Sequence, residues 1–217
     1  MSENVTKKAS KGSSEVKSML HDAWILFVIT LVAGIVLGFV YQITKEPIAR
    51  QEKKAKDAAC KAVFADAASF EELPSYSPEA AEEHLKTAGY SAQSMSDVVR
   101  AAKNDRGELL GYVLTITSSE GYGGDITFAM GIRMDGTLNG ISFLSISETP
   151  GLGMRAEEVL SPQFMNKNVT QFEYTKSGAV SDSQIDAISG ATITTNAVTN
   201  GVNAGMEYFR TVLKEGK

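Results

Sequence analysis

The stretch ITFAMGIRMDGTLNGISFLSI, residues 126–146, decides the fold. Every second residue from Ile126 to Ile132 is large and apolar, which is the pattern of a β-strand with one buried face. Asp135-Gly136 follows, and an Asp-Gly pair is a strong signal for a tight hairpin turn. Thr137–Ile146 is then the returning strand. The stretch therefore predicts two neighbouring antiparallel strands.

The chain before this hairpin predicts a second one. Val98–Lys103 and Glu108–Thr117 have the composition of strands, and they flank the turn-like tetrapeptide Asn104-Asp105-Arg106-Gly107. Together the two hairpins predict an antiparallel sheet.

Helices are expected before and after the sheet. Short helices are predicted over Glu79–Thr87, Gly151–Leu160 and Ser161–Asn166. From Asn196 onwards, apolar residues recur at spacings of three and four, which indicates a longer amphipathic helix. The predicted fold class is α+β: an antiparallel sheet flanked by helices and preceded by one N-terminal transmembrane helix.

The transmembrane helix is predicted over residues 23–44. The run AWILFVITLVAGIVLGFVYQIT contains no charged residue and exceeds the roughly 20 apolar residues that a bilayer core requires. Trp24 and Tyr41 lie near its two ends, where amphipathic rings suit the interfaces. A cleaved signal peptide is the main alternative, but its apolar core is usually only about 7–15 residues long, and no clear small-x-small cleavage site follows.

The segments around this run are polar. Residues 1–22, rich in Ser and Lys, are expected to form a disordered tail. Pro47 suits the first turn of a helix, and we expect a helical connector over residues 45–90. Lysines and an arginine flank the apolar run in similar numbers on both sides, so the positive-inside rule does not decide the orientation.

Composition narrows the possible functions. The chain has 217 residues and a formal net charge of −5, which argues against a nucleic-acid-binding protein. Its one cysteine, Cys60, excludes a disulfide within the chain and a zinc or iron–sulfur site built from its own cysteines. With only two histidines, His21 and His84, a Ser-His-Asp catalytic arrangement is also disfavoured.

Three glycine-rich segments are the candidates for function. They are Gly121–Asp125 (GYGGD), Glu148–Gly153 (ETPGLG) and Asp186–Thr192 (DAISGAT). Each could be an ordinary turn, because glycine allows a positive φ and a close approach of the backbone.

The third segment has more hydroxyl groups than a turn or helix cap needs, and it leads into the last predicted helix. The Gly190-Ala191 pair is surrounded by polar side chains at Ser189, Thr192, Thr194, Thr195 and Asn196. A helix N-terminus offers unpaired N–H groups and a positive partial charge, so the segment suits a phosphate group. It lacks the Gly-Lys-Ser/Thr of a nucleoside triphosphate-binding loop.

The third segment resembles the flavinylation motif of bacterial FMN-binding domains. The matching residues are Ser189-Gly190-Ala191-Thr192 with an aspartate, Asp186, three positions before the serine. The other two segments match the same family in the same order. With the anchor included, the chain resembles the G subunits of Rnf ion-translocating electron-transport complexes over the anchor and roughly residues 95–210.

The resemblance implies a covalent cofactor. FMN would be attached through a phosphoester to the hydroxyl of Thr192, and a separate flavin transferase that recognises Asp186 would attach it. Residues 91–217 would form this covalent FMN-binding domain. The expected hydrogen bonds to the phosphate or ribityl chain come from Ser189, Thr194 and Thr195, and Gly190 and Ala191 are also expected to bind the cofactor. The expected contacts to the isoalloxazine ring come from Thr149, Gly151, Leu152, Gly153 and Tyr122.

The resemblance also implies a function and a location. The chain would relay electrons within a ferredoxin:NAD oxidoreductase complex of a bacterial cell membrane and would catalyse nothing on its own. Its N-terminal tail would be cytoplasmic and its FMN domain extracytoplasmic. Its expected partners are the other subunits, the flavin transferase during maturation and membrane lipid, with no nucleic acid.

Two alternatives stay open at this point. The chain could be the homologous C subunit of a sodium-translocating NADH:quinone reductase, although that subunit is usually longer. It could instead be an anchored, non-redox domain that binds or senses another phosphate ligand. A Ser/Thr hydrolase is less favoured, because no plausible histidine partner lies near the motifs.

Overall fold

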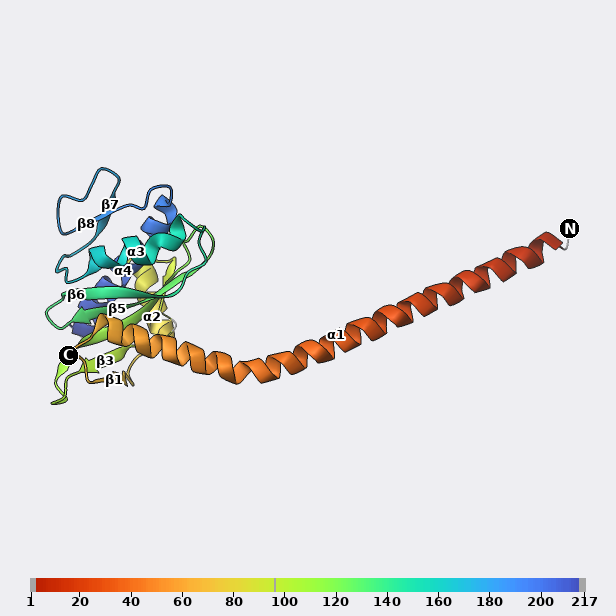
Figure 1. Cartoon of the computed structure of the whole chain (residues 1–217), viewed down its shortest axis with the longest axis horizontal. Helices are drawn as coiled ribbons and strands as arrows, with labels where there is room; N and C mark the ends of the chain where they lie inside the picture. Colours follow the sequence, from red (N-terminus) through yellow and green to blue (C-terminus); the bar gives the residue numbers. More distant parts are fainter. Residues whose placement is uncertain (1–2, 96, 215–217) are drawn as a thin grey trace. The chain divides into compact units, whose positions relative to one another are not determined.

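The computed structural model describes residues 3–95 and 97–214, and side chains from residue 17 onwards. The chain divides into two compact units, Met1–Lys53 and Lys54–Lys217. Helix α1 (Glu3–Val63) supplies the described part of the first unit and the beginning of the second (Figure 1).

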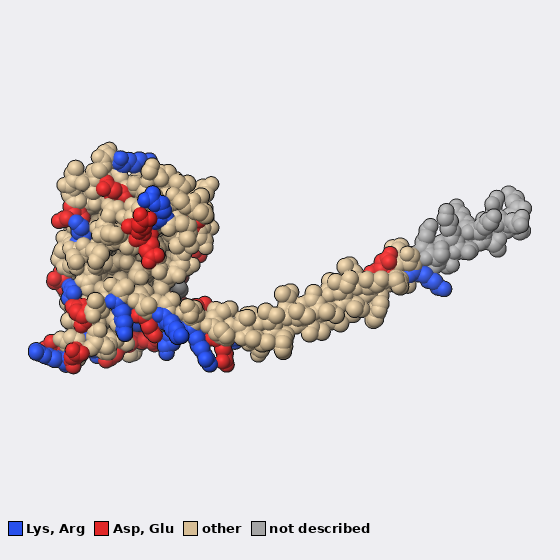
Figure 2. Space-filling model, viewed as in Figure 1, with Lys and Arg blue, Asp and Glu red and all other residues tan. Residues whose placement is uncertain are grey.

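The first unit contains one helix that is long and apolar enough to cross a membrane. Figure 2 shows an uninterrupted stretch of α1 without Lys, Arg, Asp or Glu, which corresponds to residues 23–44. The hydroxyls of Thr30 and Thr44 within it donate to backbone carbonyls of the preceding turn. Because these polar groups are satisfied inside the helix, they do not oppose burial in lipid.

Two expectations for this helix were wrong. Residues 3–22, expected to be a disordered tail, are helical, because extending an existing helix fixes one residue for each hydrogen bond gained. Pro47 lies inside α1 and not in the first turn of a helix, whereas residues 45–63 of the expected helical connector are helical and continue the membrane helix. A proline removes one backbone donor, and the helix continues on both sides of that local defect.

The second unit is built on an antiparallel sheet with the strand order β1-β3-β4-β5-β6, in which β2 also pairs with β4 (Figure 1). Both predicted hairpins are present, as β3–β4 and β5–β6. A separate parallel pair joins β7 to β8. The strands are β1 (Ser69–Glu72), β2 (Gln93–Ser94), β3 (Arg100–Lys103), β4 (Leu109–Ser118), β5 (Ile126–Arg133), β6 (Leu138–Ser145), β7 (Glu173–Thr175) and β8 (Gln184–Asp186).

The expected helical connector over residues 45–90 is only partly correct. Helix α2 (Pro78–Thr87) is present, but β1 forms an edge of the sheet by pairing with β3. The compact unit therefore begins at Lys54 and not near residue 91. A four-residue strand of sequence SFEE is too short to show a clear alternation in the sequence.

Short helices follow the sheet, as predicted, and a long helix near the end of the described chain is followed by one more short helical element. They are η1 (Gly153–Arg155), α3 (Ala156–Val159), η2 (Ser161–Phe164), α4 (Thr192–Tyr208) and η3 (Phe209–Lys214), the last of which has π-helical geometry.

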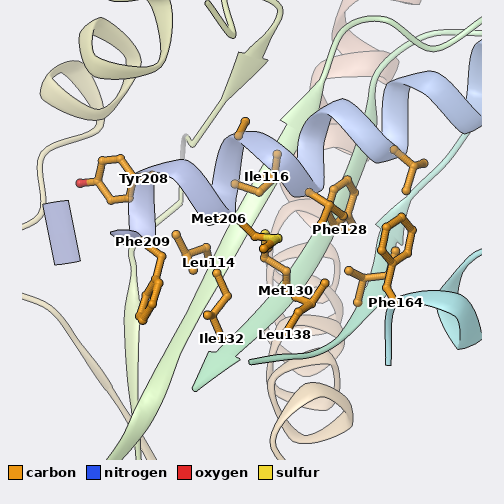
Figure 3. Close-up of a cluster of buried hydrophobic side chains, with 14 of the residues drawn as sticks. Leu114, Ile116, Phe128, Met130, Ile132, Leu138, Phe164, Met206, Tyr208 and Phe209 are labelled. Carbon is orange, nitrogen blue, oxygen red and sulfur yellow. The ribbon is translucent and has the colours of Figure 1, made fainter. Parts of the chain in front are cut away.

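Helix α4 packs on one face of the sheet and builds the main core. Met206 lies among Leu114 and Met130 from the strands (Figure 3). Two glycines of α4 bring it close to the sheet: a Cβ at Gly205 would lie 2.2 Å from the sulfur of Met130, and one at Gly201 would lie 2.9 Å from the ring of Phe128. The position of α4 on the sheet therefore depends on these glycines.

The last turns of α1 form a second, smaller core. Cys60, Val63 and the following Phe64 are buried with Val113 and other small side chains. A Cβ at Gly131 of β5 would lie 2.9 Å from the Cβ of Val63. Helix α4 thus covers one face of the sheet. Residues 59–64 pack against other side chains of the same sheet, which do not belong to the core under α4.

Candidate functional site

The three glycine-rich segments meet around one cavity of about 510 Å³. Each segment contributes to its wall, although they are far apart in the sequence. The lining residues are Tyr122, Glu148, Thr149, Leu152, Gly153, Gly190, Ala191, Thr192, Ile193 and Thr194.

Glu148, in the second segment, forms hydrogen bonds to the first segment and to the start of α4. Its carboxylate accepts a hydrogen bond from the backbone N–H of Gly123 (3.3 Å, Oε1) and another from the hydroxyl of Thr194 (3.0 Å, Oε2). The side chain is only 7% exposed although it lines the cavity. One buried carboxylate therefore joins the first segment, the second and the start of α4.

The glycines near Glu148 leave room for its carboxylate. A Cβ at Gly121 would lie 2.8 Å from Oε1, and a Cβ at Gly153 would lie 2.8 Å from Oε2 and 2.6 Å from the hydroxyl oxygen of Thr194. Contacts this short would force the backbone or the carboxylate to move. Packing around Glu148 and Thr194 thus explains Gly153, whereas at Gly121 the carbonyl oxygen of Gly124 is an even closer obstacle to a side chain than Glu148.

The start of α4 forms one side of the cavity. Ala191 is the N-cap residue and has no side chain that could accept from the first turn. The first N–H groups of a helix have no acceptor within the helix, and the helix dipole makes this end positive. Gly190 has a φ of +78°, which lets the chain turn into the helix. The arrangement favours an anionic group beside Thr192.

Apolar side chains lie on the same cavity. Leu152 and Ile193 are exposed, and Tyr122 is 71% exposed. Leu152 also approaches Gly190, whose Cβ would lie 3.1 Å from Leu152 Cδ2. The cavity therefore offers an apolar surface in addition to the positive helix end.

Four of the residues expected at the site are not part of the cavity wall: Ser189, Gly151, Thr195 and Asp186. Thr195 was expected to contact a phosphate or ribityl chain, but its side chain is 0% exposed. Its hydroxyl accepts from the N–H of Ile188 (3.1 Å) and donates to the carbonyl of Ala191 (3.0 Å). It holds the turn that leads into α4.

Asp186 lies at the end of β8, on the surface, and fixes the loop before it. Its carboxylate accepts from the N–H of Ala179 (2.5 Å). The side-chain amide of Gln163 forms two hydrogen bonds with the backbone of Asp186. It accepts one from the Asp186 N–H (2.7 Å) and donates one to the Asp186 carbonyl (3.2 Å). These contacts hold the segment that precedes the SGAT sequence.

Two lining residues were missed by the sequence analysis, Glu148 and Ile193. Glu148 opens the ETPGLG segment, but its partners lie 25 and 46 residues away, so no local pattern reveals its role. Ile193 follows Thr192 at the start of an amphipathic helix, where an apolar residue predicts core burial rather than exposure.

Comparison with known proteins connects this geometry to a family. The FMN-binding domain family matches residues 121–207, a range that contains all three segments, and the RnfG N-terminal region family matches residues 6–63.

Whole proteins with known roles also match this chain. The G subunit of the Na⁺-translocating ferredoxin:NAD⁺ oxidoreductase complex of Acetobacterium woodii is 31% identical over 192 residues, covering 88% of this chain and 91% of that protein. The G subunit of the proton-translocating complex of Clostridium ljungdahlii is 28% identical over 187 residues, covering 86% and 89%. Among solved structures, NqrC of Shewanella oneidensis aligns with a TM-score of 0.46 and 21% identity, over 54% of this chain and 59% of that one.

Proposed function

This chain belongs to the family of G subunits of ion-translocating ferredoxin:NAD⁺ oxidoreductase complexes, and we propose that it carries electrons within such a complex through FMN bound covalently to Thr192. The chain is an FMN-binding flavoprotein, a membrane-anchored protein and one member of a multi-subunit assembly. One observation carries the rest of the proposal: three segments within the FMN-binding match converge on one cavity at the start of α4.

The residues of the cavity fit FMN. Its volume of about 510 Å³ lies within the range of ordinary cofactor pockets, roughly 300–1,000 Å³. The N-terminus of α4 supplies N–H donors and positive partial charge for the phosphate. Leu152, Ile193 and Tyr122 supply an apolar surface for the ring system. When bound, FMN supplies the capacity to accept and release electrons.

Thr192 is the residue that we propose as the attachment point. It is partly exposed, it lines the cavity and it is the first residue of α4. A phosphoester on its hydroxyl would place the phosphate at the helix N-terminus. Gly190, Ala191, Thr149 and Gly153 form the surrounding wall.

The remaining expected residues take supporting roles in this proposal. Ser189 and Gly151 shape the two loops that border the cavity, and Thr194 holds Glu148. Asp186 belongs to the sequence that a flavin transferase recognises during maturation. Its exposed position and its fixed loop support this role, because a recognition element must be accessible to a second protein.

The arrangement in the membrane is also proposed. Residues 23–44 of α1 would cross the bilayer once and contact lipid, with the N-terminus in the cytoplasm and the flavin domain outside it. Covalent attachment suits that location, since lost FMN could not be replaced from a cytoplasmic pool. The other subunits of the complex would donate and accept the electrons.

Intact-mass analysis tests the attachment. The full chain is produced with an active flavin transferase, and wild type is compared with Thr192→Ala and with Thr170→Ala, an exposed threonine outside the cavity wall. We expect wild type and Thr170→Ala to be heavier by one FMN less one water and fluorescent in a denaturing gel. Thr192→Ala should lack both properties.

Two results would contradict the proposal. An adduct that persists in Thr192→Ala would place the attachment elsewhere. No adduct on wild type, with a transferase that modifies a known substrate, would favour the alternative of an anchored domain that binds another phosphate ligand.

A further inference from the structure

Glu148 is a buried carboxylate in the wall of the cavity, and both of its hydrogen-bond partners are neutral. These are a backbone N–H of Gly123 and the hydroxyl of Thr194. Among the described side chains, none of the ion pairs includes Glu148. The carboxyl group of Glu148 therefore lies beside the cavity with no cationic side chain within ion-pair distance among the described residues.

Keeping such a group buried is costly. A carboxylate that leaves water without a charged partner loses much of its solvation energy, so proteins rarely bury one without compensation. Here the chain surrounds it with glycines at positions 121 and 153, where any side chain would collide with its oxygens. If Glu148 served only to connect the loops, a neutral glutamine would form the same two bonds at a lower solvation cost. The negative charge itself thus requires an explanation.

We propose that the buried charge of Glu148 makes the flavin in this cavity harder to reduce, so that it lowers the reduction potential of the protein. The inference rests on the proposed function, because it needs a flavin in the cavity. Reduction adds electrons to a group that shares the cavity with this carboxylate. Like charges repel more strongly where the effective dielectric constant is low, as in a buried wall, than in water.

The charge can be separated from the hydrogen bonds by substitution. In Glu148→Gln, the amide oxygen can accept from the N–H of Gly123, and the amide NH₂ can donate to the hydroxyl oxygen of Thr194, which is able to accept. The variant thus keeps the shape and both contacts but lacks the charge. Glu120→Gln is a matched control, because Glu120 is a partly buried carboxylate that accepts from the amides of Gln93 (2.7 Å) and Asn200 (2.8 Å) and does not line the cavity.

The test is a redox titration of the flavin in the full chain loaded by the transferase, followed by absorbance. Intact mass first verifies equal loading of wild type, Glu148→Gln and Glu120→Gln. We expect the midpoint potential of Glu148→Gln to be more positive than that of wild type, and the potential of Glu120→Gln to match wild type. The difference should persist at high salt, since mobile ions screen a buried charge only weakly.

Each other outcome has a clear meaning. Equal potentials in Glu148→Gln and wild type, at equal loading, would overturn the inference and leave the proposed function intact. An equal shift in Glu120→Gln, or a shift that disappears at high salt, would assign the effect to overall charge and would also overturn it. Failure of Glu148→Gln alone to acquire flavin would overturn the inference, because it would assign to Glu148 a role in flavin loading in place of one in setting the potential. A wild-type protein without flavin would overturn the proposed function and the inference together.

Discussion

Thr195 and Gly153 show how single residues hold the shape of the cavity wall. The hydroxyl of Thr195 joins Ile188 to the turn before α4, and Gly153 leaves room for the contact between Glu148 and Thr194. Both residues act on the shape of the wall. Their substitution should therefore change stability first and flavin attachment second.

Thr195→Val tests the first of these roles. Valine keeps the shape of the side chain but removes the hydroxyl, and the buried N–H of Ile188 loses its acceptor. We expect the free energy of unfolding to fall by about 1–3 kcal/mol. Urea denaturation of the Lys54–Lys217 unit measures it, with Thr170→Val as the exposed control. FMN should still attach to the variant, and loss of attachment without loss of stability would return Thr195 to the flavin contacts.

Gly153→Ala tests the second role. The added methyl group would lie 2.6 Å from the Thr194 hydroxyl and 2.7 Å from the Cβ of Glu148, so the loop has to move. We expect a destabilisation of about 1–3 kcal/mol and a lower fraction of flavin-loaded protein by intact mass. Met154→Ala, at the exposed neighbouring position, is the control. Full loading and unchanged stability of Gly153→Ala would contradict the packing around Glu148.

For single residues, the sequence predicts which residues line the cavity better than it predicts what each of them does there. Tyr122, Leu152 and Thr192 were all expected at the site because glycine-rich motifs have a recognisable local pattern, and they line the cavity. That they contact FMN stays a prediction. The role of Glu148 was not predictable, because its hydrogen bonds join residues that only the folded sheet brings together.

At the scale of elements, an ion-pair cluster joins the end of α1 to β3. Asp97 lies 3.0 Å from the ammonium nitrogen of Lys56 on α1 and 3.5 Å from a guanidinium nitrogen of Arg100 on β3. Burial raises the pKa of the Asp97 carboxyl, but the ammonium group of Lys56, the hydrogen bond from the N–H of Val98 and the charge of Arg100 together lower it by more. The net result is a pKa below the ordinary aspartate value.

The lowered pKa of Asp97 predicts an acid-sensitive connection. The unfolded carboxyl has a pKa of about 3.9, so the stabilisation is fully present above that pH and is lost as the pH falls through the lower folded value. Asp97→Asn should be less stable at pH 7 by about 1–2 kcal/mol and should lose less stability than wild type on acidification. Denaturation of the Lys54–Lys217 unit from pH 7 to pH 3 measures both. Parallel curves for the two proteins would contradict the role of Asp97.

Elements with strong periodicity were predictable, whereas the short strands outside the two hairpins were not. The two hairpins and the last helix follow from alternation, turn residues and helical spacing, and the structure confirms them. Strands β1, β7 and β8 have three or four residues each, which is too few for a period to emerge. Strand β1 forms because β3 offers free backbone hydrogen-bonding groups at the edge of the sheet, and β7 and β8 form because they pair with each other.

At the scale of the whole molecule, the two units predict two different solution behaviours. The apolar side chains of the first unit are exposed, whereas those of the second form its own cores. We expect the full chain to be found in the membrane fraction and to need detergent for extraction. Residues 54–217 alone should be soluble. Fractionation of both after expression without other subunits tests this, and a membrane-bound 54–217 fragment would contradict it.

The glycines of α4 have a consequence for how electrons reach this protein. Gly201 and Gly205 set the helix directly against the β-strands, and Thr192 is the first residue of that helix. A flavin attached there is joined by one short side chain to a helix that packs closely on the sheet. Such a flavin differs from cofactors on long flexible side chains, such as lipoyl-lysine, which move between distant reaction sites. On the proposed attachment, the flavin keeps one place within the Lys54–Lys217 unit, so the redox neighbours must come within tunnelling distance of the surface of that unit beside the cavity.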